Sequence, residues 1–137
     1  MPDTWEDWRE VANERMQDAK SMLPARSASV GAIYLAGYAV ECSLKALLQR
    51  RGVGFPRQGS EGHHLRGLWA SAGFTLRDIP GNKGCETYYV EHWSTNLRYL
   101  VTESFPGSSE EMLAGAASLV RLLQTRLARE RGRRRRQ

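Results

Sequence analysis

The chain has 137 residues, 41% of them hydrophobic, which suits one compact domain with a buried core. Its two cysteines, Cys42 and Cys85, exclude a disulfide framework, and neither the cysteines nor the three histidines show metal-site spacing. Residues 129–137 hold six arginines and one glutamate, so they carry the whole net charge of +5. We therefore expect a neutral body with a basic tail, no metal and no cofactor.

The sequence predicts a cytoplasmic protein with no membrane partner. The N-terminus is acidic and amphipathic, without the cationic and then apolar order of a secretory signal. The longest uncharged run, residues 27–40, is shorter than the roughly 20 apolar residues that cross a bilayer.

A first helix is predicted from Thr4 to Leu23. Asp3 is the expected N-cap, with Glu6 as its capping-box partner, and Pro24 ends the helix. Apolar residues recur along it with the helical period, at Trp5, Trp8, Ala12, Met16, Ala19 and Leu23.

A second helix is predicted from Ser27 to Arg51, with Gly52 as its stop signal. Because it is apolar on nearly all sides over residues 30–40, it should be buried at the centre of a bundle. Its interior glycines, Gly31 and Gly37, each cost about 1 kcal/mol relative to alanine, and close approach of a neighbouring helix would justify that cost.

The remaining segments are also helical or irregular, and none alternates like a strand. We expect a loop at 53–62, a short helix at 64–73, an irregular segment at 74–84, a fourth long helix at 85–103 and a last helix at 108–127. The predicted fold is all-α: an antiparallel up-and-down bundle of four long helices plus a short helix over residues 1–128, followed by an Arg-rich tail, 129–137.

Glu41 and Lys45 form an i, i+4 pair in the favourable orientation, within otherwise apolar surroundings. One interpretation is a semi-buried ion pair that fixes helix packing, and the other is the polar floor of a cleft. Since buried charges are rarely left unpaired, we expect Glu41 to contact a second base, Arg98 or Arg15.

The ordered motifs of the chain resemble those of HEPN domains, small helical modules of toxin–antitoxin and phage-defence loci. An Arg-x-x-Asp-Ala sequence at 15–19 lies in the first helix, and YLAGYAVECSLKALL follows at 34–48. A His-x-Leu-x-x-Leu element lies at 63–68, and the Arg98-Tyr99 pair follows late in the chain. The resemblance covers about residues 5–127 and implies a helical fold.

The resemblance also implies metal-independent RNA cleavage by an Arg followed four to six residues later by a His. An arginine can neutralise charge on the phosphate, and a histidine can exchange protons with the attacking or leaving oxygen. The chain departs from this motif: residues 86–93 contain no Arg, and His92 precedes Arg98. On one continuous helix those two residues would sit about 120° apart and roughly 9 Å along the axis, so they would share a face only across a dimer.

If the protein cleaves RNA, the candidate catalytic residues are Arg98, for phosphate stabilisation, and His92 or His64, for proton transfer. Glu41, Lys45 and Tyr99 would then orient groups in the cleft. Each has a structural alternative: Arg98-Tyr99 can pair with a neighbouring helix, and His64 can be a helix-start residue.

The arginines of the tail are either a phosphate-binding segment or a solvated helix end that suits the helix dipole. The candidate nucleic-acid-binding residues are Arg131, Arg133, Arg134, Arg135 and Arg136. Two functions therefore stay open. The first is a homodimeric HEPN-like protein that binds or cleaves RNA or nucleotides. The second is a catalytically inactive interaction module, partner of a minimal nucleotidyltransferase or an antitoxin.

Overall fold

A computed structural model describes residues 2–55, 64–81 and 84–136, with side chains described up to residue 130. Within these residues the fold is entirely helical, as expected. Three long helices form its body: α1 (Trp5–Met22), α2 (Val30–Arg51) and α6 (Ser109–Arg136). Two short α-helices, α4 (Leu65–Ser71) and α5 (Cys85–Glu91), and two 3₁₀ turns, η1 (Leu76–Asp78) and η2 (Thr95–Tyr99), lie between α2 and α6 in the chain. The predicted loop at 53–62 and His63 fall largely outside the described residues.

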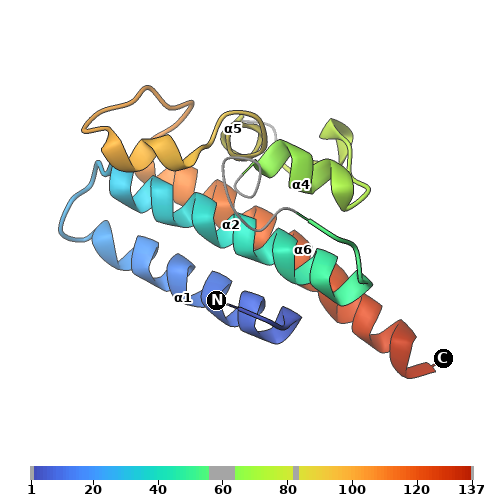
Figure 1. Cartoon of the computed structure of the whole chain (residues 1–137). Helices are drawn as coiled ribbons and strands as arrows, with labels where there is room; N and C mark the ends of the chain where they lie inside the picture. Colours follow the sequence, from blue (N-terminus) through green and yellow to red (C-terminus); the bar gives the residue numbers. More distant parts are fainter. Residues whose placement is uncertain (1, 56–63, 82–83, 137) are drawn as a thin grey trace.

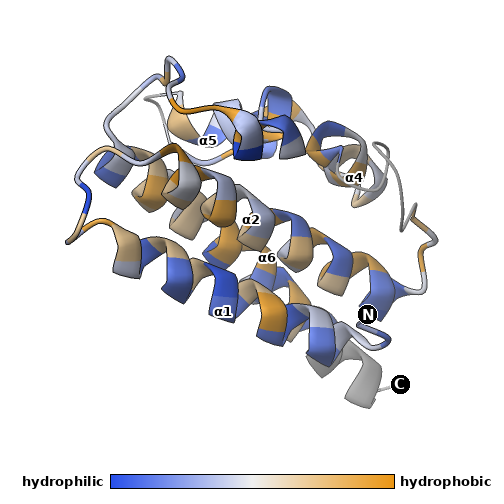
Figure 2. Ribbon diagram, turned by 60° about the vertical axis from the view of Figure 1, so that its left-hand side comes forward, coloured by the Kyte–Doolittle hydropathy of each residue, from blue (hydrophilic) through white to orange (hydrophobic). Residues whose placement is uncertain are grey.

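The long helix α2 is the centre of the fold, with α1 and α6 packed along it and α4 and α5 covering a further side (Figure 1). Figure 2 shows the hydrophobic residues of the long helices facing one another. A continuous stretch of α2, from Ala39 to Leu48, is buried. Although α2 is long and apolar enough to span a bilayer, 72% of its most apolar window is buried inside the bundle, as in a core helix.

The ends of the long helices follow local capping chemistry. Thr4, rather than the predicted Asp3, caps α1: its hydroxyl accepts from the amide of Asp7 at 3.1 Å. Ser29 caps α2, and Gly52 ends it in the left-handed conformation at φ 73°, as predicted. A capping box starts α6. The Ser108 hydroxyl accepts from the Glu111 amide at 3.1 Å, and the Glu111 carboxylate accepts from the Ser108 amide at 3.0 Å.

The predicted long helix at 85–103 is wrong. The chain forms α5 and then η2, because the carbonyl of Tyr88 accepts from the amides of both His92 and Trp93, which closes the helix. Ser94 then adopts an extended conformation, and its hydroxyl accepts from the Asn96 amide at 3.2 Å. Ser, Thr and Asn compete with the helix through such local hydrogen bonds, which is why the helix does not continue.

In an up-and-down order of four long helices the second and the last run in the same direction, and α2 and α6 keep this relation although the third long helix, predicted at 85–103, is missing. The Ser29 amide, before α2, donates to the Ser109 hydroxyl at the start of α6, and Arg51 at the end of α2 pairs with Glu130 near the end of α6. Helices α2 and α6 therefore run in the same direction, and α1 runs against both (Figure 1). With no fourth long helix to run back, short elements return the chain from the end of α2 to the start of α6.

Candidate functional site

The Glu41–Lys45 pair lies in the core between α1 and α2. The Lys45 ammonium donates to the Glu41 carboxylate at 3.0 Å, and the two residues are 1% and 0% exposed. The same ammonium lies 5.0 Å from the ring centre of Trp8 and 6.0 Å from that of Phe55. This arrangement corresponds to the packing interpretation, since an aromatic enclosure and a carboxylate surround the charge. The contact between Glu41 and a second base stays a prediction.

Arg98 lies at the surface, near the end of η2. Its guanidinium is 4.8 Å from the ring centre of Tyr99, and hydrogen bonds to Tyr99 and to Tyr34 of α2 raise the pKa of Arg98. Tyr34 in turn stacks on Trp93, with ring centres 5.9 Å apart and an interplanar angle of 18°. The sequence-predicted pair of Arg98 and Tyr99 thus forms one cluster with an aromatic residue of the central helix.

The described histidines lie elsewhere on the surface. His92 follows α5, with 68% of its side chain exposed, and contacts the ring of Tyr88 and the carboxylate of Glu91. His64 is exposed at the N-cap of α4, and its side chain makes no capping hydrogen bond. In the described part of the chain these contacts do not join either histidine to Arg98. The helical-wheel argument for His92 and Arg98 loses its premise, because no continuous helix connects them.

Burial raises the pKa of several other ionisable groups, three of them to about 12. Burial, followed by the nearby Cys42 and Glu41, raises the pKa of Tyr38 to about 12. Burial and then Glu41 raise the pKa of the Cys42 thiol to about 12, and burial and then Glu103 do the same for Tyr88. All three groups are held in their protonated forms, which suits structural packing rather than nucleophilic or proton-transfer chemistry at neutral pH.

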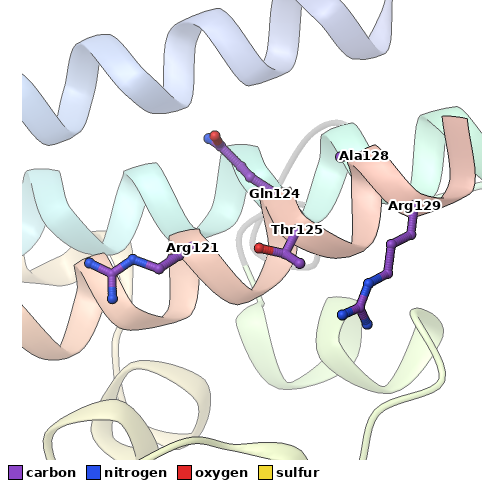
Figure 3. A pocket seen from close by; sticks show the side chains of 5 residues that line it. All are labelled: Arg121, Gln124, Thr125, Ala128 and Arg129. Atoms are coloured by element: carbon purple, nitrogen blue, oxygen red, sulfur yellow. The ribbon is translucent and has the colours of Figure 1, made fainter. Parts of the chain in front are cut away.

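A shallow hollow, which the sequence did not reveal, lies along the surface of α6 (Figure 3). It has a volume of about 500 Å³ and is lined by Arg121, Gln124, Thr125, Ala128 and Arg129. In Figure 3 the two arginines and Thr125 point away from α1, whereas Gln124 points toward it. The Gln124 amide donates to Asn13 of α1 at 2.8 Å, which fixes this side of the hollow.

A second hollow adjoins the first and shares Gln124 and Ala128 with it. It measures about 280 Å³ and adds Trp5 and Arg9 of α1 to the lining. Both hollows lie on the half of α6 that leads into the arginine-rich end. The backbone of α6 continues as a helix through Arg136, while the side chains of the tail arginines lie outside the described residues.

The spacing of Arg121, Thr125 and Arg129 was the available sequence signal. Residues four and eight positions apart lie on one helix face, and these three are exposed. We missed this signal because apolar residues between them set the core pattern of the same helix. Arg51 lies at the end of α2, where it pairs with Glu130 at 2.8 Å and donates to the carbonyl of Ala72.

Comparison with protein families matches residues 5–126 to the HEPN domain, close to the range of the sequence resemblance. Comparisons with curated proteins and with solved structures found no match. The family model covers most of the chain, including α1, α2, α4, α5 and the greater part of α6. The chain therefore belongs to the HEPN domain family.

Proposed function

We propose that this HEPN-domain protein binds RNA through the exposed face of α6. The observation that carries the proposal is the hollow that contains Arg121 and Arg129, beside an amide and a hydroxyl group, on the helix that ends in the arginine run. Guanidinium groups match phosphate geometry, and each neutralised phosphate releases condensed counterions. Among the described residues, neither Arg121 nor Arg129 forms an ion pair, so both can serve an external anion.

The charges on α1 also favour binding of the RNA on the α6 side of the molecule. Its exposed positions include Glu6, Asp7, Glu10, Glu14 and Asp18, which would repel a phosphate backbone. Arg15 on this helix is engaged by Asp18 at 3.0 Å. The acidic face of α1 and the basic end of α6 thus direct a polyanion to one side of the molecule.

Fluorescence anisotropy with a labelled single-stranded 20-nucleotide RNA tests the proposal. At about 0.1 M salt, each lost phosphate contact should weaken binding about fivefold, so the double variant Arg121→Gln/Arg129→Gln should bind about 25-fold less tightly. Lys20→Gln removes one exposed positive charge at the far end of α1. It is the control for the single variants Arg121→Gln and Arg129→Gln. Equal effects of Lys20→Gln and of either arginine variant would show that net charge, not the α6 face, determines binding.

Cleavage is a separate step and has its own assay. From the family resemblance we propose metal-independent endoribonuclease activity. Arg98 would be the phosphate-stabilising residue, and His92 or His64 would transfer the proton. Degradation of structured RNA in EDTA, abolished by Arg98→Ala, would support that activity. Intact RNA with bound protein supports binding alone, and cleavage unchanged by Arg98→Ala would remove Arg98 from the mechanism.

A second candidate function is that of a catalytically inactive interaction module, the partner of a minimal nucleotidyltransferase or of an antitoxin in a toxin–antitoxin or defence locus. A surface groove of about 290 Å³ favours it, because Val30, Val101 and Phe105 line the groove and Val101 is 87% exposed. Light scattering on the purified chain distinguishes a monomer of 15.5 kDa from a dimer. A gene for a small nucleotidyltransferase beside this one would favour the module, particularly if RNA binding is not detected.

A further inference from the structure

Tyr99 differs from the other four tyrosines of the chain in its exposure. It is 72% exposed, whereas the other tyrosines are buried or half-buried in the bundle. Leaving an aromatic ring in water is unfavourable without a further role, and the neighbouring Val101 and Leu100 are exposed as well. The ring of Tyr99 is therefore available to a flat ligand.

The Tyr99 ring is held in place by a chain of contacts to the core. Arg98 lies 4.8 Å from its ring centre, and side-chain hydrogen bonding to Tyr99 and then to Tyr34 raises the pKa of its guanidinium. Tyr34 stacks on Trp93, which is 4% exposed and packs directly on Gly37 of α2. An exposed ring with a positioned guanidinium costs less ordering entropy on binding than two mobile surface side chains.

We propose that Tyr99 and Arg98 form a stacking site for one unpaired nucleobase, a proposal that rests on RNA binding by α6. The free face of an aromatic ring accepts any base, and the adjacent guanidinium can stack on a base or contact its phosphate. A base inside a duplex is already stacked and paired, so it cannot reach the ring. The site thus makes the protein prefer single-stranded RNA to duplex RNA.

The stacking site is distant from the arginines of α6. Residues 95–101 lie beside the start of α2, at the opposite end of the molecule from the C-terminus (Figure 1). Sites without shared partners contribute independently to binding, so substitutions at the two places should have multiplicative effects on affinity. This independence allows each proposal to fail alone.

The test compares Tyr99→Ala and Tyr99→Phe with the wild type, using a 20-nucleotide single strand and the duplex of the same sequence. Tyr99→Ala should weaken single-strand binding on the order of tenfold, leaving duplex binding unchanged. Tyr99→Phe keeps the ring and should remain within about twofold of the wild type. A 2-aminopurine base in the single strand should lose fluorescence on binding the wild type and Tyr99→Phe, but not Tyr99→Ala.

The outcomes separate this proposal from the proposed function. If Tyr99→Ala binds the single strand as the wild type does while Arg121→Gln/Arg129→Gln weakens binding, the stacking site is overturned and RNA binding by α6 stands. If the wild type binds neither RNA, both proposals fail. If Tyr99→Ala changes only the mass measured by light scattering, the surface is a protein interface and the stacking site is overturned.

Discussion

Gly37 of α2 lies against the indole ring of Trp93, in the segment that follows α5. A Cβ atom at Gly37 would overlap the indole ring of Trp93, which is buried and stacks on Tyr34. The glycine therefore admits the side chain that anchors the η2 segment, including Arg98, to the central helix. The close approach predicted for Gly37 is thus made by an indole rather than by a neighbouring long helix.

Gly37→Ala should destabilise the protein. Forcing a methyl group into a packed core costs roughly 1–3 kcal/mol, only partly offset by the better helix propensity of alanine. Urea unfolding followed by circular dichroism measures the loss. Gly31→Ala is the matched control, because the tightest contact of its Cβ would be the flexible end of Met22 at 3.1 Å, with the Ser29 hydroxyl at an ordinary 3.6 Å. This variant should be unchanged or stabilised by up to about 1 kcal/mol.

Lys45→Met should be strongly destabilising, because it leaves the buried Glu41 carboxylate without its ammonium partner. Breaking a buried pair typically costs about 3–5 kcal/mol, whereas replacing both partners by apolar residues can be nearly neutral. The double variant Glu41→Leu/Lys45→Met should therefore recover much of the loss in urea unfolding. Asp18→Asn, in the exposed pair with Arg15, serves as the surface control and should cost less than about 1 kcal/mol. A double variant no more stable than Lys45→Met would contradict this account.

Stability should fall as the pH rises from about 10 to about 12. Burial raises the pKa of Tyr38 and of Tyr88 to about 12, whereas an unfolded tyrosine has a pKa of about 10. The unfolded chain thus releases these protons first, so the stabilising contribution is complete below pH 10 and is lost as the pH approaches 12. Urea midpoints measured across this range should decline less steeply for Tyr38→Phe/Tyr88→Phe. If the urea midpoints of the wild type and of the double variant decline equally with pH, the pKa values of Tyr38 and Tyr88 are not raised by burial.

The Cys42 thiol should react slowly with a disulfide reagent at pH 8 in the folded protein. Burial raises its pKa to about 12, so the reactive thiolate is scarce, and the side chain is also inaccessible. Cys85→Ala isolates this thiol, since both cysteines are buried. Reaction should become rapid in 6 M urea. A fast phase in native buffer that accounts for one thiol would show that the region around Cys42 opens readily.

The sequence predicted the long helices where local chemistry sets their ends. Helix α2 begins within three residues of its predicted start and ends as expected, because Gly52 supplies the left-handed cap. The 85–103 segment misled us, since Tyr89, Trp93 and Leu97 have helical spacing although Tyr89 lies in α5, Leu97 lies in η2 and Trp93 lies in the link between them. The up-and-down order already gives α2 and α6 one direction. The contacts that fix this direction, Arg51 with Glu130 and Ser29 with Ser109, join residues more than 75 positions apart, and no local pattern reports them.

The candidate site was only partly accessible to sequence reasoning. The Glu-x-x-x-Lys spacing predicted the Glu41–Lys45 pair, because i, i+4 residues meet on any helix. Its complete burial depends on Trp8 and Phe55, which lie in other parts of the chain. The hollow around Arg121 and its link to α1 depend on how α1 crosses α6, which is a property of the tertiary structure.

The salt dependence of RNA binding tests the central claim most directly. The logarithm of the association constant for the single strand falls linearly with the logarithm of the salt concentration. Each phosphate contact makes the slope of this line steeper by about 0.7. Removing Arg121 and Arg129 together should therefore reduce the steepness of this slope by about 1.4, with Lys20→Gln unchanged from the wild type. A slope that is the same in the wild type and in Arg121→Gln/Arg129→Gln would show that these arginines contact no phosphate and would contradict RNA binding by α6.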